Sequence, residues 1–378
     1  MTIEGSRSVD SIVHDNRFAG EACNLLFSGI LDMKQIIDRL EKAECLTRDE
    51  WILLLSGYRD EDRVYAAEKA RRIAGRYFGN RIYIRGLIEF TGFCKNNCYY
   101  CGLRRENEKA QRYRLTEEEI LSCCEQGYKL GFRTFVLQGG EDAWYTDARI
   151  EQIIRLIKGR WPDCALTLSI GEREEASYRL FYEAGADRYL LRHETGDRAH
   201  YGRLHPPEMS FDHRKDCLRA LKKTGFQTGC GFMVGSPGQC AQTLAEDMLW
   251  IQELRPHMIG IGPFIPHRDT PFGQERAGDY QMTLFLLSLL RIMGKQVLLP
   301  ATTALGTIHP GGREAGILAG ANVVMPNLSP VSVRRKYAIY DHKLCMDAEA
   351  AEGLADLEKR LRQIGYETVS ERGDWKGR

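Results

Sequence analysis

The sequence has no long hydrophobic run and no excess of charge of either sign. Its longest apolar stretch, Met282–Leu290, ends at Arg291, whereas a membrane-spanning helix needs about 20 predominantly apolar residues. The 53 basic residues nearly balance the 52 acidic residues, which leaves a net charge of +1. We therefore expect no membrane span, and no overall field that attracts nucleic acid or an anionic lipid surface.

The sequence also lacks the dense cysteine framework of a small secreted domain. Its 12 cysteines are spread over 378 residues, and no apolar segment followed by a cleavage site opens the chain. We expect a cytoplasmic protein with mostly free thiols. An apolar content of 43% and a charged content of 28% are typical of a globular protein with a sizeable core. The length allows about two domains, or one barrel with extensions.

Three of the cysteines form a motif. Cys94, Cys98 and Cys101 have CxxxCxxC spacing and directly follow the apolar run Ile82–Phe90. Cysteine thiolates are soft ligands for iron–sulfur clusters and zinc. Four thiolates would complete a tetrahedral ligand shell, but this motif supplies only three. Either a distant residue is the fourth ligand, or one metal position stays open for an exogenous ligand. A structural zinc knuckle and chance spacing are the alternatives.

The other nine cysteines show no metal-ligand spacing, and we interpret them as buried or incidental thiols. They are Cys23, Cys45, Cys123, Cys124, Cys164, Cys217, Cys230, Cys240 and Cys345.

From Arg81 onward the chain alternates short strand-like runs with amphipathic helices, which is typical of a parallel α/β fold. Eight such strands fit a (β/α)8 barrel of the TIM type, and a doubly wound open sheet is the alternative. The predicted strands are Ile82–Phe90, Thr134–Gln138, Ala165–Ser169, Arg188–Leu191, Gln227–Met233, Met258–Pro263, Val297–Ala301 and Val323–Met325. The predicted helices are one that opens at the capping box of Thr116 and Glu119, then Asp147–Lys158, Arg173–Ala184, Phe211–Thr224, Thr243–Leu254, Met282–Ile292 and Glu314–Ala319.

Helical segments flank this α/β region on both sides. Residues 1–80 are a predicted helical lead-in, of which the first 30 or so are expected to be poorly ordered or to wrap the surface. The first predicted helix runs from Asp32 through Leu40, the second begins near Thr47 and covers Trp51–Leu55, and the third spans Asp62–Tyr77. Residues 81–329 are the predicted barrel. Residues 330–378 are a predicted capping segment with one helix, Ala348–Ile364.

Polar residues follow the second and third predicted strands. In a barrel, catalytic residues lie at the carboxyl ends of the strands, so this position selects candidates before any family is considered. Gln138, Gly139 and Gly140 follow the second strand, and two glycines allow a ligand to approach the backbone closely, although an ordinary turn is the alternative. Thr167 and Ser169 lie on one side of the third strand, where hydroxyls satisfied by the backbone are the alternative.

The fourth strand runs into charged residues. Arg192 and Glu194 share one side of the chain, and Arg offers a planar fork for a carboxylate. Their alternative role is to pair with each other or with Arg214, since buried charges are costly unless they are paired. His193 should face the other way and be structural.

The later strands end in apolar and glycine-rich segments. Met233 ends the fifth strand, and a methionine in this position more often packs in the hydrophobic core than contacts a ligand. Thr302 and Thr303 end the seventh strand and lead into the loop Gly306–Arg313. A glycine-rich loop at a helix N-terminus can hold an anion, and an ordinary turn is an equal alternative.

The CxxxCxxC motif, with Tyr100 directly before its last cysteine, resembles the cluster loop of radical S-adenosylmethionine (SAM) enzymes. In that family three thiolates hold a 4Fe–4S cluster, and the amino and carboxylate groups of SAM chelate the fourth iron. One electron from the cluster then breaks a C–S bond and leaves a 5′-deoxyadenosyl radical.

Longer motifs narrow this resemblance to the radical-SAM maturases of FeFe-hydrogenase. They are Cys101–Arg105, Leu190–Thr195, Gly260–His267 and Pro300–Ala304, and the resemblance covers about residues 82–327. It implies a full barrel with SAM and cluster at its top, and an internal cavity. It also implies action on a cysteine-bound Fe(CO)2(CN) species, made by a partner maturase and used to assemble the two-iron subcluster of the H-cluster.

The same resemblance implies roles for individual residues. The cluster ligands would be Cys94, Cys98 and Cys101. Contacts to SAM would come from Tyr100, Gln138, Gly139, Gly140, Glu194 and Arg214, with Met233 and Ile265 beside the adenosyl group. The cavity wall that holds small carboxylates or anions would be Thr167, Ser169, Arg192, Thr302 and Thr303. Some members carry a second iron–sulfur site on three C-terminal cysteines; here only Cys345 lies in that region, so we predict no second cluster of that kind.

Three other functions compete with this one. Methylornithine synthase shares the cluster loop and the barrel. A biotin-synthase-like sulfur inserter would need a sacrificial second cluster, and only Cys164 and Cys230 could contribute to one at the strand ends. A non-enzymatic zinc or iron–sulfur scaffold is the third, which metal analysis would distinguish.

Overall fold

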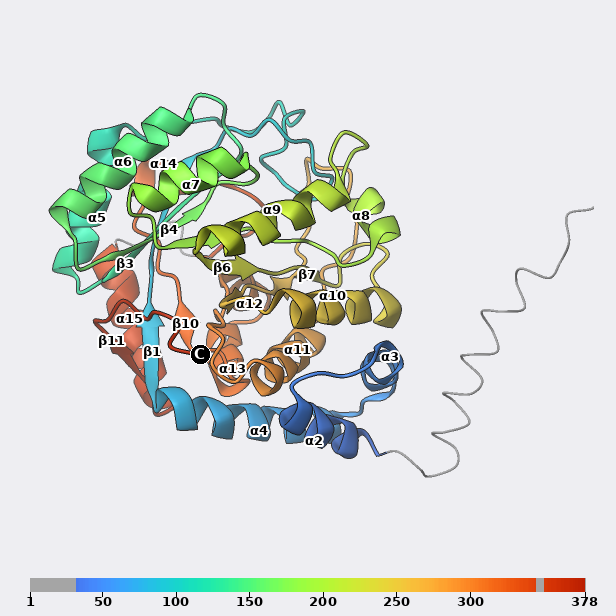
Figure 1. Ribbon diagram of the computed structural model, residues 1–378. Helices are drawn as coiled ribbons and strands as arrows, with labels where there is room; N and C mark the ends of the chain where they lie inside the picture. Colours follow the sequence, from blue (N-terminus) through green and yellow to red (C-terminus); the bar gives the residue numbers. More distant parts are fainter. Residues whose placement is uncertain (1–31, 345–349, 378) are drawn as a thin grey trace, which may run out of the picture.

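The computed structural model describes residues 32–344 and 350–377. The predictions made for residues 1–31, Cys23, Cys345 and the first two residues of the predicted C-terminal helix lie outside the described residues. A parallel sheet curves through the centre of the fold, with helices on its outside (Figure 1). None of the helices in the described ranges has the length and hydropathy of a membrane span.

The strands pair in parallel and form three sheets. Six strands have the order β2-β3-β4-β5-β6-β8, three have the order β10-β1-β11, and β7 pairs with β9. The strands are β1 Arg81–Ile84, β2 Gly86–Thr91, β3 Thr134–Gly139, β4 Ala165–Ser169, β5 Arg188–Leu190, β6 Gln227–Cys230, β7 Met233–Val234, β8 Met258–Ile259, β9 Gly262–Pro263, β10 Val323–Val324 and β11 Glu367–Val369.

The predicted parallel α/β fold is confirmed, but among residues 32–344 and 350–377 continuous hydrogen-bonded ladders do not close it into a barrel. Residues 297–301, the predicted seventh strand, form only isolated parallel bridges, at Leu298 with Met258 and at Pro300 with Val323. Pro300 has no N–H to donate, which weakens a strand at that point. A further bridge joins Leu87 of β2 to Asn327.

Three predicted strands are each divided in two. Arg85 separates β1 from β2, and the two halves pair with different neighbours. Between β6 and β7, a side chain at Gly231 would overlap the carbonyl of Gly260, which lies between β8 and β9. The two backbones approach so closely here that both strands break at the same level.

The helices between the strands agree with the predictions to within a few residues at their ends. They are α5 Glu117–Lys129, α6 Asp147–Arg160, α7 Glu175–Glu183, α9 Phe211–Thr224, α10 Ala241–Leu254, α11 Tyr280–Met293 and α13 Gly312–Leu318. The sequence did not predict α8 Arg198–Leu204, α12 Thr303–Ile308 and α14 Val331–Arg334. Most of the predicted glycine-rich loop after Thr302 is therefore helical.

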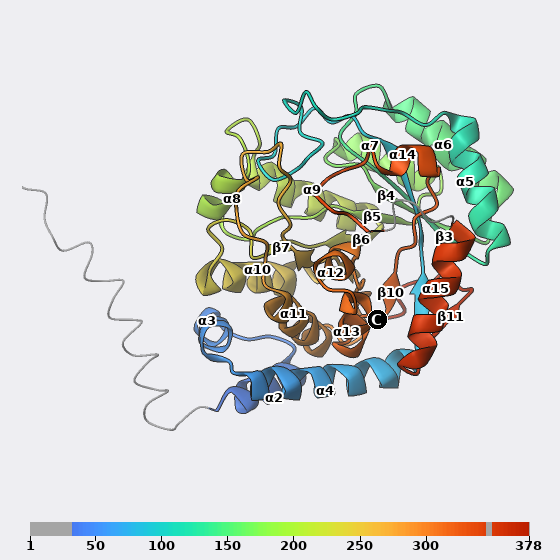
Figure 2. The same ribbon diagram turned by 180° about the vertical axis from the view of Figure 1, so that it is seen from behind.

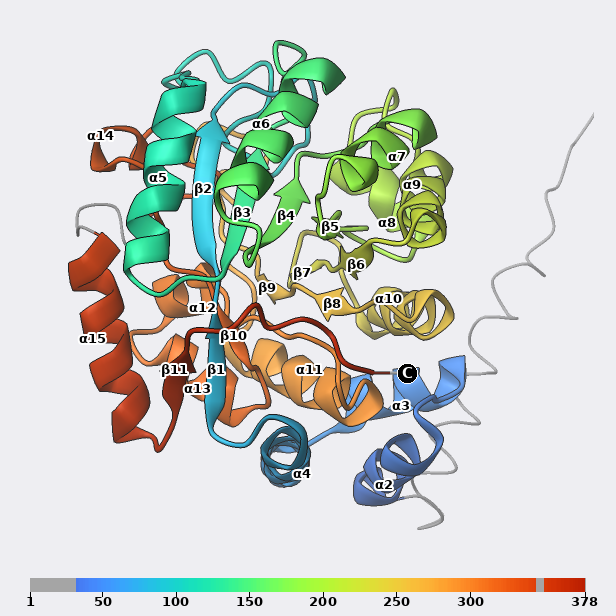
Figure 3. The ribbon, with the colours of Figure 1, turned by 60° about the vertical axis from the view of Figure 1, so that its left-hand side comes forward.

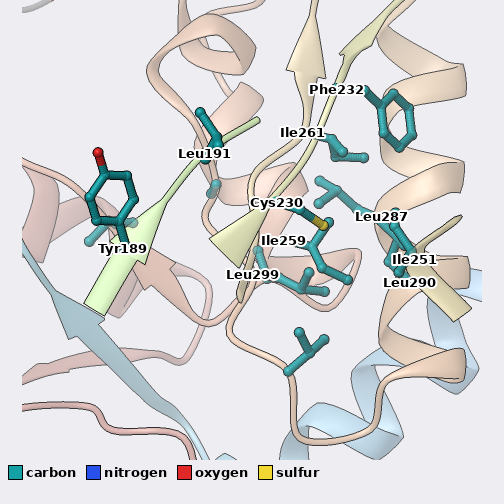
Figure 4. Packing of buried hydrophobic residues seen from close by; sticks show 14 of the residues in the cluster. Tyr189, Leu191, Cys230, Phe232, Ile251, Ile259, Ile261, Leu287, Leu290 and Leu299 are labelled. Atoms are coloured by element: carbon teal, nitrogen blue, oxygen red, sulfur yellow. The ribbon is translucent and has the colours of Figure 1, made fainter. Parts of the chain in front are cut away.

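The core lies between the strands and the outer helices. Figure 4 shows Cys230 and Ile259 of neighbouring strands packed toward Ile251 of α10 and Leu287 of α11. All four side chains are almost fully buried, and each large apolar side chain buried in this way stabilises the fold by about 1.5–3 kcal/mol.

Three N-terminal helices, α2 Met33–Ala43, α3 Arg48–Gly57 and α4 Asp60–Phe78, pack against this outer layer. Helix α4 lies along α11, and α3 lies against α10. The fully buried Trp51 of α3 donates from Nε1 to Oε1 of Gln252 at 2.7 Å. Residues 32–80 of the lead-in are thus packed onto the α/β unit.

The C-terminal segment reaches both ends of the strands. Helix α15 Ala350–Gln363 and β11 lie beside β1 (Figures 2 and 3). At the amino ends of the strands, the buried Arg188 of β5 donates to Asp374 at 2.5 Å and to the carbonyl of Arg372 at 2.7 Å. At the opposite ends, residues 337–344 contact the cysteine loop, as described below.

Candidate functional site

An internal cavity of about 340 Å³ lies inside the curve of the sheet, toward the carboxyl ends of the strands. Most of the predicted site residues line it. They are Cys98, Tyr100, Cys101, Gln138, Gly139, Thr167, Ser169, Arg192, Glu194, Arg214, Met233, Ile265, Thr302 and Thr303.

Two predicted residues lie just outside the cavity wall. The Sγ of Cys94 accepts from the backbone N–H of Glu141 at 3.4 Å. A side chain at Gly140 would overlap the carbonyl of Phe93 and Cβ of Cys94. Gly140 is therefore required for the loop after β3 to pack against the cysteine loop, and it does not face the cavity.

The three cysteines of the motif are each partly buried, and the charges of Cys94 and Cys101 act on Cys98. Burial raises the pKa of the Cys94 thiol, raises that of Cys98 well above its usual value, and raises that of Cys101 to about 12. Negative charge on Cys101 and Cys94 raises the pKa of Cys98 further. Three thiolates at a partly buried site would repel each other, and the positive charge of an iron–sulfur core would offset that repulsion. The donor set thus fits an iron–sulfur cluster. Within the described ranges, no three His, Cys, Asp or Glu side chains gather as a single-ion site.

Tyr100 is oriented by a buried histidine. Nδ1–H of His205 donates to the carbonyl of Tyr201 at 3.1 Å, so Nε2 is free to accept from the Tyr100 hydroxyl, also at 3.1 Å. Burial, and then the nearby positive charge of Arg214, lower the pKa of His205 to about 3. The imidazole therefore stays neutral at physiological pH, and the Tyr100 hydroxyl keeps its acceptor.

This histidine predicts a pH-dependent stability. The native pKa of His205 is about 3 and the ordinary value is about 6.5, so the unfolded state binds a proton between these values while the native state does not. Stability must then fall as pH falls. From pH 7.0 to 5.5 the free energy of unfolding should drop by about 1.3 kcal/mol through this group alone. In His205→Gln, the fall measured by denaturant unfolding should be smaller by that amount.

The exposed His309 provides the control for this measurement. His309→Gln should retain the wild-type pH dependence. An equal pH dependence in wild type and His205→Gln would show that His205 binds a proton as readily in the native state as in the unfolded state.

Glu194 adopts an unusual backbone conformation. Its φ is +64°, in the left-handed region that non-glycine residues rarely occupy and that costs of order 1–3 kcal/mol. Its N–H donates to the carbonyl of Gly231 at 3.1 Å. Its carboxylate is buried and Oε2 has no protein partner. Burial raises the pKa of Glu194, against the lowering effect of Arg192 and Arg214. A ligand donor in the cavity would satisfy this oxygen.

The residues behind Glu194 hold its loop in place. The backbone N–H of Gly231 donates to Nδ1 of His193 at 3.3 Å, so Nε2–H donates to Oδ1 of Asp247 at 3.2 Å. The same Asp247 oxygen accepts from the N–H of Gly196 at 2.5 Å. His193 is buried and absent from the cavity wall, which confirms the structural role predicted for it.

Other buried polar atoms in the cavity wall also lack protein partners. They include the hydroxyls of Thr167 and Thr302, and Arg192 lines the same cavity. Arg214 is already engaged, because it pairs with Glu172 and donates to the carbonyl of Arg192 at 2.9 Å. The wall therefore presents unsatisfied hydroxyls and a cation to a small polar or anionic ligand.

Two charged residues of the cavity wall, Arg85 and Glu89, are not among the predicted site residues. Arg85, Leu87 and Glu89 all line the cavity, and alternation along the predicted strand would have placed them on one side. The presence of two charged residues on the inner side of an otherwise apolar strand could have identified them as candidate site residues. Arg85 donates to Sδ of Met258 at 3.0 Å, and its Nε and Nη2 have no protein partner.

The C-terminal segment contributes residues that no local pattern could have revealed. Lys343 forms a buried ion pair with Glu89, and Nδ2 of Asn327 donates to the other carboxylate oxygen of Glu89 at 2.8 Å. Nε2 of Gln138 donates to the hydroxyl of Tyr337 at 3.3 Å. The segment thus closes one side of the cavity.

Comparisons with known proteins show which families the chain resembles. A family model described as the radical SAM superfamily matches residues 88–251. The chain is 42% identical to the FeFe-hydrogenase maturase subunit HydE of Thermotoga maritima, over 91% of this chain and 97% of that protein. It is 30% identical to 3-methylornithine synthase of Methanosarcina barkeri, over 87% of this chain and 92% of that protein.

Solved structures show the same architecture. The crystal structure of methylornithine synthase (PylB) covers 88% of this chain and 97% of its own, with a TM-score of 0.78 at 28% identity. The structure of HydG, a maturase of FeFe-hydrogenase, covers 94% of this chain and 79% of its own, with a TM-score of 0.76 at 19% identity. The likeness to HydG supports the fold alone.

Proposed function

Because the chain belongs to the radical SAM superfamily and, within it, to the family of the FeFe-hydrogenase maturase HydE, we propose that it cleaves SAM reductively and acts on an organometallic precursor of the H-cluster. The precursor is a cysteine-bound Fe(CO)2(CN) species. The observation that carries the proposal is a single cavity that is lined both by Cys98 and Cys101 of the motif and by buried polar atoms without protein partners.

Cys94, Cys98 and Cys101 would hold a 4Fe–4S cluster, which when bound supplies the one electron that breaks the C–S bond of SAM. Glu194 would accept a hydrogen bond at Oε2 from a ribose hydroxyl or the ammonium group of SAM. The backbone of Gly139 lies in the cavity wall and would accept from the same ammonium. The buried residues hold these acceptors in place before the ligand arrives.

Other residues would shape the rest of the SAM site. Tyr100, fixed by His205, and Arg214, fixed by Glu172, lie in the same wall as Gln138. Met233 and Ile265 would form an apolar wall beside the adenosyl group. Gly140 would contribute indirectly, because it lets the loop after β3 pack against the cysteine loop.

The substrate would lie on the other side of the cavity. Arg192 offers a planar fork to a carboxylate of the cysteine-bound species. The hydroxyls of Thr167, Ser169, Thr302 and Thr303 would donate to its remaining oxygen or cyanide acceptors. The free hydroxyls of Thr167 and Thr302 support this assignment.

We extend the proposal to the organisation of the chain. The isolated bridges at Leu87, Met258 and Pro300 support a (β/α)8 barrel over residues 81–329, preceded by the lead-in 1–80 and closed by the cap 330–378. The partners would be other hydrogenase maturases that supply and receive the small organometallic species. Free thiols at the ten cysteines of the described ranges support a reducing cytoplasm as its location.

The experiment that tests the function is an anaerobic reconstitution with iron, sulfide and SAM, followed by addition of dithionite. We expect 5′-deoxyadenosine, and turnover of a synthetic cysteine-bound Fe(CO)2(CN) species. Zinc in place of iron, with no SAM cleavage, would favour a non-enzymatic scaffold.

The second candidate is methylornithine synthase, which the 30% identity and the TM-score of 0.78 favour. The same assay with lysine as substrate distinguishes the two. Isomerisation of lysine at the rate of SAM cleavage would replace the maturase assignment.

Removal of Arg192 tests the substrate side of the cavity. In Arg192→Ala the three cysteines are untouched, so iron content and the SAM-dependent signal of the reduced cluster should stay at wild-type levels. The apparent KM for the cysteine-bound species should rise about tenfold to a hundredfold, because a charge-assisted hydrogen bond contributes roughly 1.5–3 kcal/mol. Steady-state kinetics with the synthetic species measures this change.

Arg192→Lys is the matched variant, since it keeps the charge but loses the planar fork. It should recover only part of the affinity. Loss of the cluster in Arg192→Ala would instead assign Arg192 to the fold.

A further inference from the structure

A second hollow lies on the outer surface, on the other side of the cysteine loop from the internal cavity. Its volume is about 480 Å³. Gly102, Leu103 and Asn107 line it, whereas Cys98 and Cys101 line the internal cavity. The cysteine loop is therefore a thin partition with one face toward the cavity and one toward solvent.

The floor of this outer pocket is the backbone that directly follows Cys101. The N–H of Gly102 donates to the carbonyl of Ile339 at 3.0 Å, and its own carbonyl accepts from Nδ2 of Asn107 at 2.7 Å. A side chain at Gly102 would overlap the carbonyl of Ala338 and the ring of His267. Neighbouring Cα atoms are about 3.8 Å apart, so the pocket reaches to within one residue of a cysteine of the motif.

The walls of the pocket carry a surplus of positive charge. The cationic side chains are Lys109, Arg268, Arg335 and Lys336, and the carboxylates are Asp269 and Asp341. The whole chain is almost neutral, with a net charge of +1, so this surplus is a local feature and not a property of the surface in general.

Two of the cations project into solvent. The side chains of Lys109 and Arg268 are 78% and 67% exposed, and they pair with Asp269 at 2.8 Å and Asp341 at 3.2 Å. Exposed pairs of this kind are weak and screened. They can exchange partners with an incoming acidic surface, and a patch of one sign raises the association rate of a partner of the opposite sign.

We propose that this outer pocket and its cationic rim are the docking surface for an acidic one-electron carrier protein of the iron–sulfur or flavin class. This proposal rests on the proposed function, since reductive cleavage of SAM consumes one electron per turnover. SAM and substrate occupy the cavity side of the partition, so the carrier approaches from the outer side. One electron leaves the reduced carrier and enters the cluster held by the three thiolates; no proton moves and no bond forms or breaks in this step.

The test uses the reconstituted holoenzyme and a purified acidic 2[4Fe–4S] ferredoxin as the probe. The charge-reversed variant is Lys109→Glu with Lys336→Glu. The matched control is Lys129→Glu with Lys223→Glu, at two exposed lysines of α5 and α9 that line neither pocket. Binding is measured by biolayer interferometry at several salt concentrations, and cluster reduction by stopped-flow absorbance with either reduced ferredoxin or dithionite.

We expect the pocket variant to weaken ferredoxin binding at low salt at least tenfold, and to slow reduction by ferredoxin to a similar extent. The salt dependence of binding should become shallower in this variant only. Reduction by dithionite, which needs no docking surface, should not change in either variant.

The outcomes separate this proposal from the proposed function. Unchanged ferredoxin binding in the pocket variant, or equal weakening in the control, overturns the docking surface while dithionite-driven SAM cleavage stands. Ferredoxin that binds at this surface but does not reduce the cluster also overturns the docking proposal. The surface would then fit a partner that carries no electron, such as another maturase. If dithionite does not reduce a cluster in the wild-type protein, the proposed function is wrong.

Discussion

The Cys98→Ala protein, purified anaerobically and reconstituted with iron and sulfide, is expected to retain no 4Fe–4S cluster and to form no detectable 5′-deoxyadenosine. The motif supplies three protein thiolates, and two cannot hold a cluster whose fourth iron must stay open for SAM. Cys98 is also one of the two cysteines that line the cavity, so its loss exposes the remaining ligands to water from that side. Iron and sulfide analysis, together with electron paramagnetic resonance with and without SAM, measures the loss.

The exposed Cys45 provides the control. Cys45→Ala should retain wild-type iron content and product yield, which separates loss of a ligand from general thiol chemistry. Normal cluster content and normal 5′-deoxyadenosine in Cys98→Ala would contradict the assignment of the motif.

The sequence located the site because its residues follow strand ends in a regular way. Thr167 and Ser169 lie two residues apart on one strand, and both face the cavity as the alternation of a strand requires. The rule that chemistry lies at the carboxyl ends of parallel strands selected Gln138, Arg192 and Glu194. The structure brings all five residues to one cavity.

The features that the sequence did not predict depend on contacts between distant segments of the chain. Lys343 lies 254 residues from Glu89, and no local pattern relates them. Strand β11 forms only because β1 offers it an edge. The break at Gly231 reflects the close approach of Gly260, a tertiary contact that a periodic strand pattern does not contain. Tertiary contacts therefore decide which elements divide and which segments close the site.

Lys343→Met is expected to lower the free energy of unfolding by roughly 3–5 kcal/mol, because it leaves the buried Glu89 without its cation. The side chains of Lys343 and Glu89 are 6% and 0% exposed. After the substitution, the Glu89 carboxylate keeps only the bond from Asn327 at 2.8 Å. Urea unfolding of the protein, followed by circular dichroism, measures the change.

Two further variants determine whether burial causes this effect. Lys109→Met removes a lysine that is 78% exposed and paired with Asp269, and it should cost less than about 1 kcal/mol. The double variant Glu89→Gln with Lys343→Met removes both charges and should recover most of the loss, since a neutral pair needs no counter-charge. A cost for Lys343→Met as small as that for Lys109→Met would mean that water reaches the pair. Residues 337–344 would then not seal the cavity, and SAM cleavage without substrate should already be high in the wild-type protein.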